Sequence, residues 1–268
     1  VNIGKNNVYK VVFNSTNVHD DVFEIFRQAN NTKVFYDNEF GVDKKVYNNY
    51  KKTLEKFINN PQKGSLIELC VKSSNNKDDI YHQIPHFIFP IFGLFLTTTP
   101  RLLILLCNHP NILNRVIQEV NNNNVSNLQF LRKCIMETVR LNSPVISLFR
   151  TLEKDMQLNK RYFKKGTQLL LLTNPILRQN EHFPNAYKFV PQRWNEKLEK
   201  EYYAISFSQG PQKCPGKELA IFLVQSFIYN LIKIKEIGSK NKLETNKKID
   251  INNIPQVINT CNVVFNFE

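Results

Sequence analysis

The amino-acid sequence predicts a mainly α-helical protein with a small β part. Only 8 of the 268 residues are glycine, which argues against a barrel built on glycine-rich turns. Apolar residues recur three and four positions apart in several segments, the spacing of a helix with one buried face. Hydrophobic residues make up 42% of the chain, including 20 Phe and 10 Tyr. We therefore expect a sizeable core, in one domain or a closely joined pair.

Two helices are predicted in the first sixty residues. Residues 22–26 carry apolar side chains at helical spacing, and either Asn17 or Asp20 can begin this helix. Residues 46–58 also keep helical spacing. We expect that helix to stop before Pro61, because the residue preceding a proline is pushed out of the helical region.

The segment from Ile84 to Leu106 is the most membrane-like of the chain. Its polar or helix-breaking residues are His86, Pro90, Thr97 to Thr99, Pro100 and Arg101. Because a spanning helix needs about twenty apolar residues with few charges, we expect a buried helix instead. The opening VNIGKNNVYK has neither the apolar core nor the cleavage site of a secretory signal. We expect no signal peptide and no clear transmembrane segment. The expected location is therefore cytoplasmic or unknown.

Three more helices are expected further along the chain. Pro110 is a favoured first residue for a helix over 110–120. The cleanest helical pattern covers 128–141, and Pro144 forbids its continuation. Residues 219–232 are apolar nearly all round, which predicts a central helix.

The β part is predicted from shorter patterns. Residues 145–172 are β-like, with a turn at Lys165 and Gly166 and a buried strand over 169–172. Residues 175–193 contain three prolines and are expected to be irregular. Alternating apolar residues at 263–267 predict a final strand.

Charge and cysteine content exclude two classes of protein. The formal net charge is +13, but Lys and Arg are spread along the chain, without a run of five or six and without a nucleic-acid motif. We expect a solvated basic surface and no nucleic acid. Five cysteines without paired spacings do not describe a disulfide framework. Cys70, Cys107 and Cys134 lie among apolar residues, where free cysteine behaves as a small hydrophobe, and a reducing compartment is expected.

The most informative segment is FSQGPQKCPGKELA, residues 207–220. Cys214 follows a glycine-containing loop and leads directly into an apolar helix. The free N–H groups and the positive end of that helix stabilise negative charge on sulfur, the form that binds metal. Gly210 and Gly216 allow the backbone to approach a flat ligand closely. Phe207 can pack near the sulfur and exclude water from it.

This segment resembles the haem-binding signature of the cytochrome P450 family, Phe-x-x-Gly-x-x-x-Cys-x-Gly, with every fixed position filled. METVRLNSP resembles the family's Glu-x-x-Arg helix, with Glu137 and Arg140 one turn apart. YKFVPQRW resembles its Phe-x-Pro-x-Arg segment and supplies Arg193. SLFRTLEKD places Arg150 where the family keeps an arginine for a haem propionate. The resemblance is good over residues 80–268 and poor before them.

The resemblance implies a cytochrome P450-like fold whose N-terminal portion is reduced or missing. It divides the chain into a short helical segment, residues 1–80, and a haem-binding core, residues 81–268. Haem, iron-protoporphyrin IX, is the implied cofactor. The implied cofactor-binding residues are Cys214 as metal ligand, with Phe207, Gly210, Gly216 and Arg150. Glu137, Arg140 and Arg193 are the implied structural trio, in which a buried Glu between two Arg needs bidentate geometry to offset desolvation.

Three features depart from the family pattern. The chain is shorter than usual. Gln212 stands where the family has a basic residue that contacts a propionate, with Lys213 beside it. Gly93 and Leu94 stand where the distal helix usually has an acid and an alcohol that feed protons to dioxygen. Thr97 can be that alcohol if one helical turn is deleted.

Three functions remain open at this point. The first is a monooxygenase acting on a small apolar or lipid-like substrate, with an acidic electron-donor protein that docks on a basic surface including Lys213 and Lys217. The second is an isomerase or lyase of fatty-acid hydroperoxides, suggested by Gly93 and Leu94, because such substrates already hold both oxygens. The third is a non-catalytic haem-binding remnant, suggested by the length.

Overall fold

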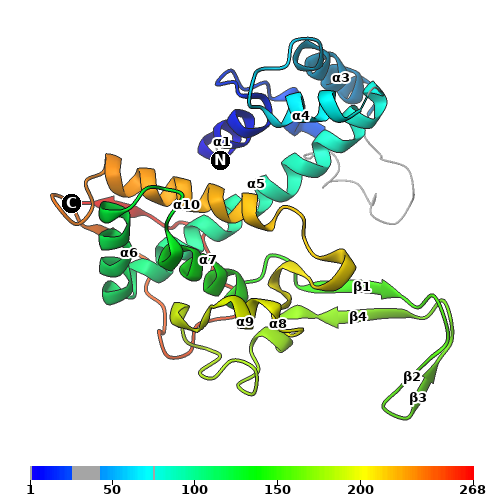
Figure 1. Ribbon diagram of the computed structural model, residues 1–268. Coiled ribbons are helices and arrows are strands. Elements are labelled where there is room, and N and C mark those ends of the chain that lie inside the picture. Colours follow the sequence, from blue (N-terminus) through cyan, green and yellow to red (C-terminus); the bar gives the residue numbers. More distant parts are fainter. Residues whose placement is uncertain (1, 26–42, 75) are drawn as a thin grey trace. The chain divides into compact units, whose positions relative to one another are not determined.

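The computed structural model describes residues 2–25, 43–74 and 76–268, and it forms two compact units, Val1–Leu96 and Thr97–Glu268 (Figure 1). Each unit is described by itself. The mainly α-helical prediction is confirmed, with three small antiparallel sheets among the described residues. The sequence predicted that a haem-binding core begins after residue 80. The division into two compact units does not test that boundary.

The first unit is built from helices. α1 spans Asn2–Phe13, α3 spans Lys44–Asn59, and α4 spans Leu66–Ser73. The helix predicted over 22–26 is present at residues 21–25, and the backbone N–H groups of Phe23 and Glu24 donate to the carbonyl of Asp20. Phe26, at its predicted end, lies outside the described residues. α3 ends before Pro61, as predicted.

Aromatic packing forms the core of this unit. The ring of Phe13 lies 4.6 Å from that of Tyr9 and 4.5 Å from that of Phe57, between centroids. The buried hydroxyl of Tyr50 donates to the carbonyl of Tyr81 at 2.7 Å, which satisfies a polar group inside the core.

α5 spans Lys77–Cys107 and continues through Pro85, Pro90 and Pro100. The helix predicted over 84–106 is therefore present and longer than expected. Asp78 and Asp79 lie in its first turn, where their negative charges stabilise the helix by interacting with the positive end of its dipole. By length and composition alone α5 could cross a membrane, and about half of its most apolar window is buried within the protein.

Three helices form the core of the second unit. α6 spans Pro110–Asn122, α7 spans Gln129–Leu141, and α10 spans Lys217–Ile234. α10 packs against both α6 and α7. α7 is buried over most of its length, Cys134 included. α10 was predicted to be central, but its buried residues lie on one face and Phe222 on the other is exposed. Cys70 and Cys107 are only half-buried.

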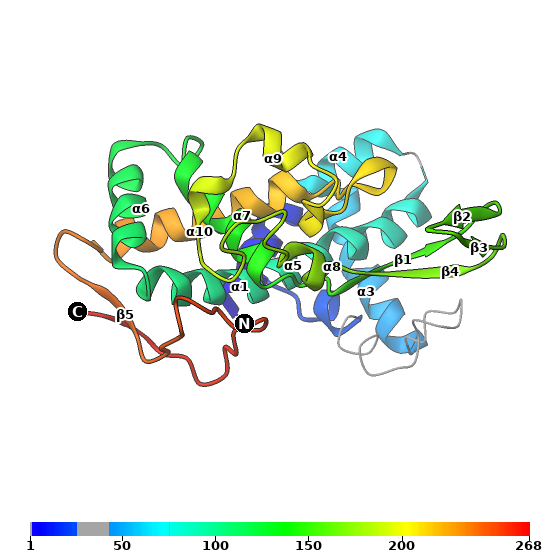
Figure 2. The ribbon, with the colours of Figure 1, turned by 90° about the horizontal axis from the view of Figure 1, so that it is seen from below.

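The small sheets have two strands each. β1 (Ser147–Thr151) pairs with β4 (Gln168–Leu172), β2 (Met156–Leu158) with β3 (Arg161–Phe163), and β5 (Leu243–Thr245) with β6 (Phe265–Phe267). Both views show the β1–β4 ribbon and the β2–β3 hairpin extending away from α7 and α10 (Figures 1 and 2).

The prediction that residues 169–172 form a buried strand is wrong in its burial. The strand exists, but Leu170 is 53% and Leu172 51% exposed. A ribbon of two strands that stands off the helices leaves apolar residues in solvent, and an apolar run by itself does not report how many layers cover a strand. The turn at Gly166 is confirmed, with φ of 86°.

The irregular region expected over 175–193 is present and continues to the cysteine loop. It contains α8 (Thr173–Leu177), a 3-10 turn at Pro191–Arg193, and α9 (Glu196–Lys200). Two further 3-10 turns, Ile205–Phe207 and Gly210–Gln212, lead into α10.

Candidate functional site

Cys214 lies two residues before the residue that caps α10, Gly216. It is half-buried and forms no disulfide. Its backbone N–H donates to the carbonyl of Phe207 at 2.9 Å, so the loop of residues 207–214 closes on itself. Cys214 lies just before the first turn of α10, and stabilisation of its negative charge by that helix end stays a prediction.

The closed loop contains two unusual backbone conformations. Gly210 has φ of 68°, which glycine adopts without a steric penalty. Ser208 has φ of 58° and ψ of 174°, a region occupied almost only by glycine. Strain of this kind collects at functional sites. Residue type alone gave no signal for Ser208.

Arg150 reaches this loop from β1. Its Nη2 donates to Oγ of Ser208 at 3.3 Å, and its Nη1 donates to the carbonyl of Phe149 at 2.7 Å. The structure therefore brings Arg150 to the cysteine loop, 64 positions before Cys214 in the sequence. Phe149, the preceding residue, and Ile146, just before β1, are exposed apolar residues.

The two loop glycines have open surroundings, as Gly64, Gly93 and Gly166 also do, so this space admits a flat ligand without selecting for one. A Cβ added to Gly210 or to Gly216 would have no atom within 4 Å. Gly216 has φ of −88°, which any residue adopts, so its backbone does not explain the glycine. Open space beside it, a free thiol two residues away and an arginine near exposed apolar side chains suit a flat apolar group that carries acidic substituents.

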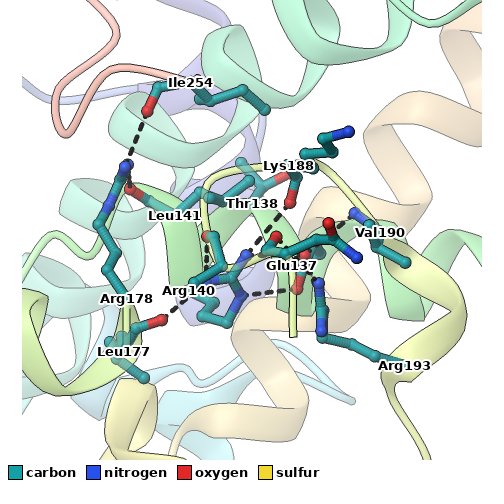
Figure 3. A network of polar contacts seen from close by, with 12 residues as sticks. Glu137, Thr138, Arg140, Leu141, Leu177, Arg178, Lys188, Val190, Arg193 and Ile254 are labelled. Carbon is teal, nitrogen blue, oxygen red and sulfur yellow. Dashed lines mark hydrogen bonds and ion pairs between the residues drawn. The ribbon is translucent and has the colours of Figure 1, made fainter. Parts of the chain in front are cut away.

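The predicted trio comes together inside the second unit (Figure 3). The carboxylate of Glu137 is fully buried and accepts hydrogen bonds from Arg140 Nε and Nη2, each at 2.9 Å, and from Arg193 Nε at 3.1 Å. The geometry with Arg140 is bidentate, as predicted.

Two further donors to Glu137 were not predicted. The indole Nε1 of Trp194 donates at 2.8 Å and the backbone N–H of Val190 at 3.0 Å. In the sequence, Trp194 next to Arg193 was the only available signal.

Arg140 and a second buried arginine bind backbone carbonyls (Figure 3). Arg140 Nη1 donates to the carbonyls of Leu177 at 2.7 Å and Ala186 at 2.9 Å. Arg178 Nη1 donates to the carbonyl of Ile254 at 2.8 Å, which fastens a late segment of the chain. Burial, with the positive charge of Arg140 nearby, lowers the pKa of Arg178 to about 10. Sequence reasoning missed Arg178.

The structure does not test the predicted roles of Thr97, Gly93 and Leu94 on α5. Thr97 is half-buried and is the first residue of the second unit. Gly93 and Leu94 belong to the first unit. The role of Thr97 as a proton-delivering alcohol stays a prediction.

The basic surface predicted beside the cysteine loop is wrong in one member. Lys213 is exposed, but Lys217 is buried and its Nζ donates to Glu199 Oε2 at 2.6 Å. A cavity of about 610 Å³ lies here, and acidic Glu196 and Glu218 line it together with the lysines. The spacing in the sequence placed Lys217 near the loop but gave no indication of its partner.

The sequence model described as cytochrome P450 matches residues 13–237. The chain belongs to the cytochrome P450 family. Members of this family bind haem, and the free thiol, the open space beside Gly216 and the position of Arg150 fit that group. The mainly α-helical architecture with small sheets agrees with this family.

Curated relatives are similar over parts of the chain. It is 33% identical over 102 residues to (21S)-21-acetyl-1-hydroxy-apo-melianone synthase of Melia azedarach, covering 38% of this chain and 21% of that one. It is 26% identical over 178 residues to cytochrome P450 85A1 of Solanum lycopersicum, covering 60% and 38%. It is 26% identical over 179 residues to the mitochondrial 1,25-dihydroxyvitamin D(3) 24-hydroxylase of Mus musculus, covering 62% and 35%. The chain thus spans less than two fifths of the length of these relatives.

Proposed function

We propose that this chain binds haem through the thiolate of Cys214 and belongs to an oxidoreductase of the monooxygenase type. The observation that carries the proposal is the closed loop of residues 207–214, which holds a free, half-buried cysteine in front of α10 with open space beside Gly216. Thiolate-ligated haem supplies the activation and cleavage of the O–O bond.

The residues of the loop have separate tasks in this proposal. Cys214 provides the ligand, and the end of α10 stabilises its negative charge. Phe207 is buried and keeps water away from one side of the loop. Gly210 and Gly216 give room to the flat ring.

Arg150 binds a propionate in this proposal. A guanidinium has five N–H donors in a planar fork that suits a carboxylate. Its bonds to the carbonyl of Phe149 and to Ser208 orient the side chain at the loop. The strained Ser208 therefore serves to hold the arginine.

Glu137, Arg140 and Arg193 are structural in this proposal. Their network is buried and binds the backbone of the segment that precedes α9 and the cysteine loop. It orients the loop without touching the reacting atoms.

The substrate we propose is a small apolar or lipid-like molecule. Exposed apolar residues, among them Ile146 and Phe149, precede or adjoin Arg150 on the same strand region. One relative is a hydroxylase by name, and that name fits a monooxygenase. An acidic electron-donor protein is the proposed partner, with exposed Lys213 as a contact.

A hydroperoxide isomerase or lyase is the second candidate, favoured by Gly93 and Leu94 at the acid and alcohol positions. Turnover of a lipid hydroperoxide without reductant supports it, and strict dependence on reductant removes it. A purified chain that does not retain haem favours the third reading, a non-catalytic remnant.

The deciding experiment is an absorption spectrum of the haem-reconstituted chain, reduced and saturated with carbon monoxide. Thiolate ligation gives the red-shifted Soret band of the family, and Cys214→Ala abolishes it. Cys261→Ala removes an exposed cysteine and serves as the matched control. An unshifted band in the unaltered chain, or a shifted band that survives Cys214→Ala, refutes the proposal.

A further inference from the structure

We infer that Glu199 is a positioning residue for Cys214. The consequence for catalysis rests on the proposed function. Glu199 lies on α9, and its Oε2 accepts from Lys217 Nζ at 2.6 Å and from Arg132 Nη2 at 2.8 Å. Lys217 is the first residue of α10, three positions after Cys214. One carboxylate oxygen thus joins α7, α9 and α10.

The backbone around Glu199 is tied to the other end of the cysteine loop. The side-chain Nε2 of Gln209 donates to the carbonyls of Glu199 at 3.0 Å, Glu201 at 3.2 Å and Ala204 at 3.3 Å. Gln209 belongs to the loop of residues 207–214. The end of α9 therefore holds the loop near its start, and Glu199 holds the helix that follows it.

Burial separates this ion pair from an ordinary surface pair. The side chain of Lys217 is 9% exposed and that of Glu199 is 20% exposed. Removing one partner of such a pair leaves the other charge poorly solvated, which is costly, whereas exposed pairs contribute little. Glu218, which also binds Arg132, is 71% exposed and is the matched comparison.

Lys217 also connects Glu199 to the motif residue Phe207. The ammonium lies 5.8 Å from the centroid of the Phe207 ring, within cation–π range. Phe207 accepts the backbone hydrogen bond of Cys214. Loss of the Glu199 charge frees Lys217 to leave the ring and loosens the bond that closes the loop.

This network is separate from that of Glu137. Glu137 binds Val190, Arg193 and Trp194, which precede α9. Glu199 acts at the last turn of α9, after the N-cap residue Asn195. A change at Glu199 is therefore expected to loosen the cysteine loop while the Glu137 contacts remain.

The first test uses the haem-free chain and compares Glu199→Gln with Glu218→Gln. Amide hydrogen exchange of Cys214 reports opening of its bond to Phe207. We expect exchange about tenfold faster in Glu199→Gln, the effect of losing one charge-assisted contact. Exchange in Glu218→Gln stays at the level of the unaltered chain. Equal exchange in both variants overturns the inference.

The second test measures the haem-bound chain. The fraction of the carbon-monoxide complex with the red-shifted Soret band falls in Glu199→Gln and is unchanged in Glu218→Gln. A merely structural role would lower the denaturation midpoint without changing this fraction, and that result overturns the inference. If the unaltered chain takes up no haem, the proposed function fails while the exchange measurement still decides on Glu199.

A compensating variant covers the case in which Glu199→Gln does not fold. Lys217→Met removes the buried charge and keeps most of the side-chain volume, so Glu199→Gln combined with Lys217→Met no longer buries an unpaired ammonium. We expect this double variant to fold. Its Cys214 amide should exchange faster than in the unaltered chain. Where Glu199→Gln can also be measured, the double variant should exchange more slowly than that single variant. Exchange equal to that of the unaltered chain overturns the inference.

Discussion

Glu137→Gln is the most informative single change for the fold. In the structure the carboxylate of Glu137 receives five hydrogen bonds, two of them from Arg140. Glutamine has the same shape but keeps one acceptor oxygen and replaces the other with an NH2 group. On the side of Oε2, that group would face the N–H donors of Arg140 and Trp194.

The expected cost follows from the burial of both partners. Glu137 and Arg140 are 0% exposed, and breaking a buried ion pair by removing one charge costs about 3–5 kcal/mol. This is a large share of the ~5–15 kcal/mol by which a domain is usually stable. With a urea dependence of about 2 kcal/mol per molar, the denaturation midpoint falls by about 2 M.

Urea denaturation of the haem-free chain measures this cost. Trp194 is the single tryptophan of the sequence, so its fluorescence reports the network directly, and far-ultraviolet circular dichroism reports the helices. Glu181→Gln, at an exposed position, is the control and is expected within about 0.5 kcal/mol of the unaltered chain. A loss below about 1 kcal/mol in Glu137→Gln would contradict the energetic role given to the trio.

Two further predictions concern backbone strain and pH. Ser208→Gly relieves the strained φ while Ser208→Ala keeps it, and both lose the bond to Arg150, so the glycine variant should be more stable by about 1 kcal/mol in urea denaturation; equal stabilities would refute the strain. Burial raises the pKa of the Cys134 thiol well above its ordinary value, so the folded chain keeps a proton that the unfolded chain loses. Stability then falls as the pH rises above about 9, by at most ~1.4 kcal/mol per pH unit for this thiol. In Cys134→Ala the denaturation midpoint should fall less steeply between pH 8 and about pH 10. An unchanged slope would show that the Cys134 thiol does not cause this pH dependence.

Helices and their ends could be predicted because local physics determines them. The helix at 128–141 has apolar residues at helical spacing, and the structure begins and ends α7 within one residue of that range. The position of the strand over 169–172 was predicted correctly, but the prediction that it is buried was wrong. Coverage of a strand depends on the layers packed against it, which no short segment of sequence contains.

The candidate site divides in the same way. Glu137, Arg140 and Arg193 could be assigned from their motifs, and the structure brings them together. Trp194 and Arg178 could not, because their partners are carboxylate and carbonyl oxygens from distant segments. Lys217 was assigned to an exposed basic surface because spacing reports proximity to the loop, whereas pairing with Glu199 depends on where α9 folds back.

The buried network of Glu137 and the partly buried network of Glu199 have α7 in common. Glu137 and Arg132 both lie on α7, and each binds the segment around α9, one before that helix and one at its last turn. Because α7 is buried over most of its length, we expect it to keep its position when one of these contacts is lost, so that the other contact remains. We therefore expect the packing of α7, a helix that ends more than seventy residues before Cys214, to help hold the segments that lead into the cysteine loop.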